Sequence, residues 1–276
     1  MTNQSTTAIV LRTVDFSETS LIVTLLTKDL GRISALAKGA RRLKGPFEGS
    51  LDLLSVCAIT LIDKPGDTLD LLTESKLRRR FRGAQRSLER LHAGYYIAEM
   101  LRLLVDDDDP HRELFDMTLS AMGMIDGEGD VAKTLLAFDA QCLRLLGHAP
   151  ATQRCTVCGR DAERSRRRAS FSLVGGGVVC ENCRPSQSHL MTANWDALDA
   201  LRELASDPES PPSTAEENAD NPSQPPPTSF PIGRLFPAMT PAIYRDLRGL
   251  LNRTLESLAG QKPRMQPFLP DKLDSL

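Results

Sequence analysis

The chain has 276 residues, of which 41% are hydrophobic and 25% charged, and its formal net charge is −2. This balance is that of an ordinary globular protein and excludes collagen-like, coiled-coil and wholly disordered chains. The length predicts more than one domain, because a single core rarely grows much beyond about 250 residues. No apolar run approaches the roughly 20 residues of a membrane helix, and the polar start has no signal-peptide pattern, so we expect a cytoplasmic protein without membrane contact.

Residues 1–80 are predicted to form a small β-barrel. Five short segments rich in Val, Ile, Leu and Thr lie between residues 7 and 76. Turn formers such as Gly45 and Pro46 separate them, and no helical period lies between them. Closing five antiparallel strands hides their edges, which favours an OB-type barrel over an open sheet.

Residues 81–150 are predicted to be helical and to begin a second, α-helical domain. Apolar residues recur every three or four positions from Leu88 to Leu104, as on one buried helix face. Asp109, followed by Pro110, is predicted to cap the next helix, and Asp130 to cap the third. The sequence therefore predicts an α+β protein of several domains.

Residues 151–190 carry two Cys-x-x-Cys pairs separated by 21 residues. The four cysteines are Cys155, Cys158, Cys180 and Cys183. Two such turns supply four thiolates, the ligand set of a structural zinc site without an open position for water. Between the pairs, FSLVGGGVVC is typical of two strands joined by a glycine turn. We expect structural Zn²⁺ in a ribbon inserted into the helical domain; a redox site or metal-free cysteines are the alternatives.

The remaining chain is predicted to complete the helical domain in two pieces. A helix is expected over residues 191–205, with Thr192 as its cap, and residues 206–231 are rich in Pro, Ser and acid and are predicted to be disordered. Residues 232–276 are predicted to return to the helical domain, with Thr240 and Pro241 beginning a helix that Gly260 ends.

Basic residues gather in two runs that flank the predicted barrel, although the whole chain is nearly neutral. The candidate DNA contacts are Lys38, Arg41, Arg42 and Lys44 in the first run, and Arg78, Arg79, Arg80 and Arg82 in the second. Cations on such a module bind phosphates and release counterions. The aromatic residues nearby are Phe16, Phe47 and Phe81, so we expect contacts mostly to the DNA backbone.

No catalytic motif accompanies these features, because the sequence has no phosphate-binding loop, no Gly-x-Ser-x-Gly and no His-Glu-x-x-His. We therefore expect a binding protein and not an enzyme. Two other interpretations remain open: a zinc-ribbon module that binds protein without contacting DNA, and a redox-sensing cysteine protein.

The segment from Ala8 to Gly45 resembles the start of the bacterial RecO family of recombination mediators. The matching pieces are Val10 to Arg12, Ser17 to Thr19, Thr27, Gly31 and Lys38 to Arg42, and the cysteine insert is similar to that of zinc-bearing members. The resemblance implies an N-terminal OB domain, a helical domain with a four-cysteine zinc module, and no catalytic activity. It also implies binding to single- and double-stranded DNA, annealing of complementary strands, and loading of RecA onto strands coated with single-stranded DNA-binding protein (SSB), near the nucleoid. RecR and the SSB C-terminal tail are the implied partners.

Overall fold

The computed structural model describes residues 3–42, 45–47, 49–62, 69–164, 167–206 and 239–270. It confirms the predicted fold class, in which a five-stranded barrel is followed by helices and a cluster of four cysteines. The chain divides into two compact units, one up to Gly127 and one from Glu128 onward. This division groups the first helices with the barrel, whereas we drew a boundary at residue 80; the domain boundaries stay predictions.

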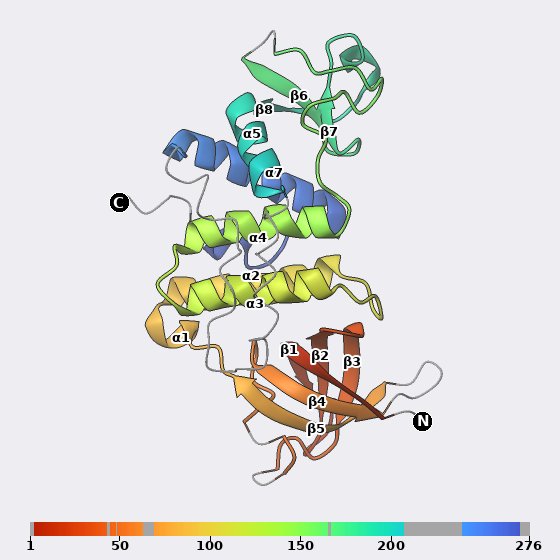
Figure 1. The fold of residues 1–276 in the computed structure, drawn as a ribbon, viewed down its shortest axis with the longest axis vertical. Helices are drawn as coiled ribbons and strands as arrows, with labels where there is room; N and C mark the ends of the chain where they lie inside the picture. The colour runs from red at the N-terminus through yellow and green to blue at the C-terminus, as the bar shows by residue number, and fades with distance from the viewer. Residues whose placement is uncertain are drawn as a thin grey trace, which may run out of the picture. The chain divides into compact units, whose positions relative to one another are not determined.

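The strands of the first unit close into a barrel in the order β1-β2-β3-β5-β4 (Figure 1). They are β1 (Asn3–Asp15), β2 (Leu21–Thr27), β3 (Gly31–Ala37), β4 (Val56–Ile62) and β5 (Asp70–Arg79). All neighbours are antiparallel except β3 and β5, whose parallel ladder pairs Ala35 with Asp70 and Ala37 with Leu72. Alternate residues such as Val23, Leu25 and Ile33 fill the interior, as the pleat requires.

The predicted strand segments ended by residue 76, whereas β5 continues through Arg79. Lys76 stays opposite Ala58, and Arg79 opposite Val56. The register shifts between these pairs and leaves Arg78 without a partner on β4, which is the arrangement of a β-bulge. The basic stretch therefore begins inside the sheet.

Three helices complete the first unit: α1 (Gly83–Arg86), α2 (Leu88–Leu104) and α3 (Arg112–Asp126). Helices α2 and α3 lie side by side, and α2 packs on β1 (Figure 1). The prediction that Asp109 caps α3 is wrong, because the N-cap residue is His111. The Asp109 carboxylate instead contacts Nε2 of His111 at 2.9 Å, and its backbone lies against Gly31.

The second unit begins with α4 (Val131–Leu145), whose N-cap is Asp130 as predicted. A three-stranded sheet in the order β7-β6-β8 follows, built from β6 (Arg168–Ser172), β7 (Gly177–Val179) and β8 (Leu190–Asn194). The sequence pattern missed β8: the predicted cap Thr192 lies in this strand, where it pairs with Ser170. Asn194 caps the next helix, since its side chain accepts a hydrogen bond from the backbone N–H of Asp196.

Helices α5 (Trp195–Leu204) and α7 (Pro241–Ala259) complete the second unit, with short 3-10 turns η1 (Arg184–Ser186) and η4 (Gln266–Phe268). The predicted cap Thr240 and the left-handed terminator Gly260 are both confirmed. The predicted disorder falls almost entirely on residues outside those described. Of the helices described, none has both the length and the hydropathy to cross a membrane.

A buried ion pair joins the first and last helices of the second unit. The guanidinium of Arg248 on α7 bonds the carboxylate of Asp139 on α4, and both side chains are buried. Nε of Arg248 also donates to Oδ1 of Asn252 at 3.2 Å. Because an isolated buried charge is very unfavourable, each partner requires the other.

Substituting Gly31 by alanine is expected to destabilise the first unit. Gly31 has φ of +77°, and a Cβ there would lie 2.5 Å from the backbone of Asp109. We expect a loss of at least about 2 kcal/mol in the free energy of unfolding, from strain plus the displaced α2–α3 loop. Urea denaturation followed by circular dichroism measures it. Gly147→Ala is the control, since Gly147 has φ of +76° with no atom within 4 Å; an equal loss there would contradict the role of the contact.

Candidate metal centre and nucleic-acid interface

The first cysteine pair lies on a tight turn that aims both sulfurs to one side. The backbone N–H of Gly159 donates to the carbonyl of Cys155 at 2.9 Å. Gly159 has φ of +71°, a conformation that favours glycine. At the second pair, the N–H groups of Cys183 and Arg184 donate to the carbonyl of Cys180 at 3.1 and 3.0 Å. Both turns are thus fixed by the backbone.

The structure brings all four predicted cysteines together. Every sulfur lies within 4.8 Å of the other three, and Sγ of Cys158 is 3.7 Å from Sγ of Cys180. Four sulfurs held about 2.3 Å from a tetrahedral ion stand roughly 3.8 Å apart, so the observed spacing fits a metal. No disulfide joins them. These four residues could therefore hold a metal ion.

The pKa values of one thiol in each turn are shifted in opposite directions. Burial raises the pKa of Cys155, but backbone N–H groups, including those of Cys180 and Cys158, outweigh it and bring the pKa to about 6. Sharing hydrogen bonds with Cys158 and Cys180 raises the pKa of Cys183 to about 12. The peptide groups thus already stabilise a thiolate at Cys155, which is the form that binds metal.

Two further cysteines, Cys57 and Cys142, lie outside this cluster. Burial raises the pKa of both Cys57 and Cys142. Cys57 donates its S–H to the carbonyl of Ser50 at 2.8 Å inside the barrel, and Cys142 is buried in α4. Both behave as small core residues.

Strand β7 holds the two turns together. The N–H of Thr156, next to the first ligand, donates to the carbonyl of Val178 at 3.0 Å, and Val178 donates to Ala151 at 2.8 Å. A Cβ on Gly177 would lie 2.4 Å from the carbonyl oxygen of Ala151. The segment before Cys155 therefore reaches β7 only because residue 177 has no side chain.

Gly177→Ala is expected to weaken metal retention even though residue 177 is not a ligand. The added methyl group pushes Ala151 and Thr156 from β7, which displaces the first cysteine turn. We expect the protein to lose metal to a chelator at least about tenfold faster than wild type, since altered ligand support typically costs 10–100-fold in affinity. Gly176→Ala is the control: Gly176 has φ of +65°, so alanine strains the same turn, but no atom lies within 4 Å of the added Cβ. Equal loss in both variants would contradict the mechanism.

The arginines around the metal centre are mostly paired with acids. Arg154 lies 3.3 Å from Asp161, and Arg184 lies 4.0 Å from Glu181. Arg164 makes a bidentate pair with Asp199 and stacks over Trp195 with its guanidinium carbon 5.1 Å from the ring centroid. Arg160, directly after the first cysteine turn, is the exception: it is exposed and makes no ion pair with a described residue.

The first basic run lies in the turn after β3. Lys38 and Arg42 are exposed and make no ion pair with a described residue. Arg41 forms an ion pair with Asp15 at 3.1 Å, and its backbone N–H donates to the carbonyl of Thr19 at 3.1 Å. This turn is thereby fixed to the β1–β2 turn. Lys44 lies outside the described residues.

The four arginines of the second run differ in exposure and in their partners. Arg78 in the bulge and Arg82 after the strand are exposed, without an ion pair in the described chain. Arg80 pairs with Asp52 at 2.9 Å and donates to the carbonyl of Gly49 at 2.9 Å. Arg79 is half-buried and donates to the carbonyl of Leu119 on α3 at 3.4 Å. Burial lowers the pKa of Arg79, and the charge of Asp126 opposes this shift.

One stretch of chain connects the two runs. After the turn that carries Lys38 and Arg42, the chain passes along β5, where the N–H of Ser75 donates to the carbonyl of Pro46 at 3.2 Å. It then reaches Gly49, which accepts from Arg80. Pro46 and Gly49, which lie between the two runs in sequence, are therefore hydrogen-bonded to the second half of β5 and to the residue that follows it.

The structure separates the three aromatic candidates. Phe16 in the β1–β2 turn is 59% exposed, whereas Phe47 is 4% exposed and belongs to the barrel core. Phe81 is half-buried, and its ring packs directly against Gly83 and Gly94: a Cβ built on either glycine would lie 2.5 or 2.7 Å from the ring. Only Phe16 of these three presents its ring to solvent.

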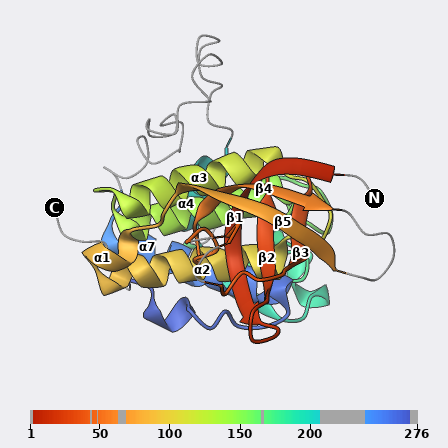
Figure 2. The ribbon, with the colours of Figure 1, turned by 90° about the horizontal axis from the view of Figure 1, so that it is seen from below.

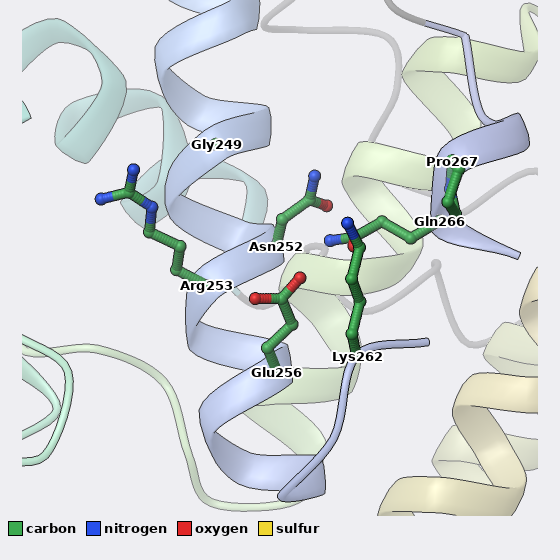
Figure 3. Close-up of a pocket in the computed structure, with 7 residues that line it drawn as sticks. All are labelled: Gly249, Asn252, Arg253, Glu256, Lys262, Gln266 and Pro267. Carbon is green, nitrogen blue, oxygen red and sulfur yellow. The ribbon is translucent and has the colours of Figure 1, made fainter. Parts of the chain in front are cut away.

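A shallow pocket lies between α7 and η4 (Figure 3), lined by Gly249, Asn252, Arg253, Glu256, Lys262, Gln266 and Pro267. It contains charges of both signs, and none of its side chains was singled out in the sequence. Arg253 points away from the side chains of Lys262 and Gln266 (Figure 3). The pocket adds no group to the metal centre or to the basic surface.

Comparison with known proteins identifies the family. The model described as Recombination protein O N terminal matches residues 1–81, and the one described as Recombination protein O C terminal matches residues 85–216. The chain belongs to the RecO family. The DNA repair protein RecO of Rhodopirellula baltica is 95% identical over 98% of this chain and 100% of its own length.

More distant RecO proteins are also similar in sequence to this chain. DNA repair protein RecO of Anaeromyxobacter sp. (strain Fw109-5) is 33% identical over 72% of this chain and 77% of its own length. That of Roseiflexus sp. (strain RS-1) is 31% identical over 74% of this chain and 70% of its own length. The chain therefore has a role in recombinational DNA repair.

Proposed function

We propose that this RecO protein acts as a recombination mediator that binds single- and double-stranded DNA on the barrel. It anneals complementary strands and assists the loading of RecA onto strands coated with SSB, without covalent chemistry. The observation that carries this proposal is the pair of basic runs on one barrel in a member of a DNA repair family.

Exposed cations without carboxylate partners explain how such a surface would work. Lys38, Arg42, Arg78 and Arg82 have no ion pair among the described residues, so binding a phosphate breaks no existing pair. Each phosphate that a cation neutralises releases a condensed counterion, and this gain supports binding to any sequence. Neutralising two strands at once lowers their mutual repulsion and allows complementary bases to pair.

The ion pairs modify the predicted set of contacts. Arg41 and Arg80 already neutralise Asp15 and Asp52, and Arg79 is half-buried against α3. These three arginines contribute chiefly to the shape of the barrel surface. We therefore rank the unpaired cations above them as phosphate contacts.

We propose that the metal is zinc and that its role is structural. Four thiolates fill the tetrahedral shell of Zn²⁺ and leave no position for a substrate. The sheet beside the cysteines has strands of 3 to 5 residues, which is short for an independently stable unit. Metal binding would supply the free energy that folds it.

The partners follow from family membership. We propose RecR and the C-terminal tail of SSB as protein partners, and a cytoplasmic location near the nucleoid. The alternative is a zinc-ribbon module that binds proteins without touching DNA, and the DNA measurements below distinguish the two.

Reversing the charge of Arg42 or Arg78 is expected to weaken DNA binding and annealing. Each variant should lower affinity for single-stranded DNA by about tenfold and reduce the slope of log affinity against log salt by about one, because one phosphate contact is lost. Fluorescence anisotropy between about 50 and 200 mM salt, and annealing of SSB-coated strands, measure both effects.

Arg245→Glu is the control for net charge, since Arg245 is an exposed arginine on α7. It should change affinity by less than about twofold, because no phosphate contact is assigned to it. Wild-type affinity that is independent of salt would contradict DNA binding on this surface and favour the protein-binding alternative.

Purified protein is expected to contain about one zinc ion per chain. Cys180→Ser should abolish zinc retention, because three thiolates and a hydroxyl make a weaker site. Cys57→Ser is the control, as its hydroxyl can keep the hydrogen bond to Ser50. Elemental analysis with thiol titration decides: metal-free protein with two disulfides would contradict the proposed site.

A further inference from the structure

Strands β1, β2 and β3 lie side by side in the barrel (Figure 2). The sequence pattern did not reveal which residues make up their outer face. Strand register places side chains in rows across these three strands. One row is Arg12, Thr24 and Ser34, and the next is Val14, Ile22 and Leu36. The residues on either side of the first row, the pairs Val23 with Ala35 and Leu25 with Ile33, fill the barrel interior, so both rows face outward.

A third row adds the exposed aromatic ring. The backbone N–H of Phe16 donates to the carbonyl of Ser20 at 3.0 Å, which continues the β1–β2 ladder by one pair. Leu21 lies opposite Ala37, so Ser20, directly before β2, and Lys38, directly after β3, lie at the same end of the sheet. By alternation along the strands, Phe16 and Ser20 share the outer face with the other two rows, and the exposed Lys38 begins the turn at that end of β3.

The surface combines apolar and cationic side chains. Phe16 is 59% exposed and Val14 39% exposed, and Arg12 and Lys38 lie at opposite ends of the three rows. Neither cation makes an ion pair with a described residue. Asp15 points to the opposite face of β1 and is paired with Arg41. A second acidic residue, Glu18, lies in the turn beyond Phe16.

We propose that this outer face is a subsite for unpaired bases, in which Phe16 stacks on one base while Arg12 and Lys38 contact the flanking phosphates. An exposed ring between cations is the chemistry that holds single-stranded nucleic acid without sequence preference. In duplex DNA each base is already stacked between its neighbours and has no free face. Phe16 therefore makes this protein favour single strands over duplexes, an inference that rests on the proposed DNA-binding function.

Three probes test the subsite: an oligo(dT) strand, a strand of equal length with abasic positions, and a duplex of equal length. Wild type should bind oligo(dT) more tightly than the abasic strand. Phe16→Ala should lose about tenfold in affinity for oligo(dT), the effect of one stacked base, and less than about twofold for the duplex. Phe16→Trp should keep the affinity, and its added fluorescence should be quenched by oligo(dT) but not by the abasic strand.

Phe268→Ala is the matched control, because Phe268 is a phenylalanine of similar exposure, 55%, in the other compact unit. It should leave all three affinities unchanged. Equal losses of Phe16→Ala for single strand and duplex, or wild-type affinity that ignores the missing bases, would overturn the subsite while leaving backbone binding intact. Wild type that binds none of the probes would overturn both the subsite and the proposed function.

Discussion

Closure of the barrel rests on a short parallel ladder between β3 and β5, which pairs residues 35–37 with residues 70–72. Every other junction in the barrel is antiparallel and longer. Because β5 runs in the same direction as β3 and is longer, its second half extends past the end of β3. Two described residues of the chain after β3 contact that extension: the carbonyl of Pro46 accepts from the N–H of Ser75, and the carbonyl of Gly49 accepts from Arg80.

The two compact units are stabilised by different means. The described part of the barrel buries a continuous apolar interior. The cysteine sheet buries only a few apolar residues, among them Phe171 and Val178, and its two turns converge on four sulfurs. The cysteine sheet therefore has a smaller apolar core than the barrel and a cluster of sulfurs that the barrel lacks among its described residues.

The barrel strands and the cysteine cluster could be predicted from the sequence because the patterns that indicate them are local. All five barrel strands and the four converging cysteines follow from alternation and spacing. The failures were caused by contacts between distant segments. Asp109 does not cap α3 because its backbone packs on Gly31, and residues 190–194 form a strand because β6 is available as a partner. The ion pairs of Arg41 and Arg80 depend on which acids the fold brings near them, and no charge run reveals that.

The pair of Asp139 and Arg248 has an evolutionary consequence. A substitution at either position alone leaves an unpaired charge in an apolar interior and destabilises the fold. Replacing both residues by apolar ones is often neutral for stability. The two positions are 109 apart in sequence. They should therefore vary together among homologues, as an acid with a base or as two aliphatic residues, and intermediates that carry only one member should be rare.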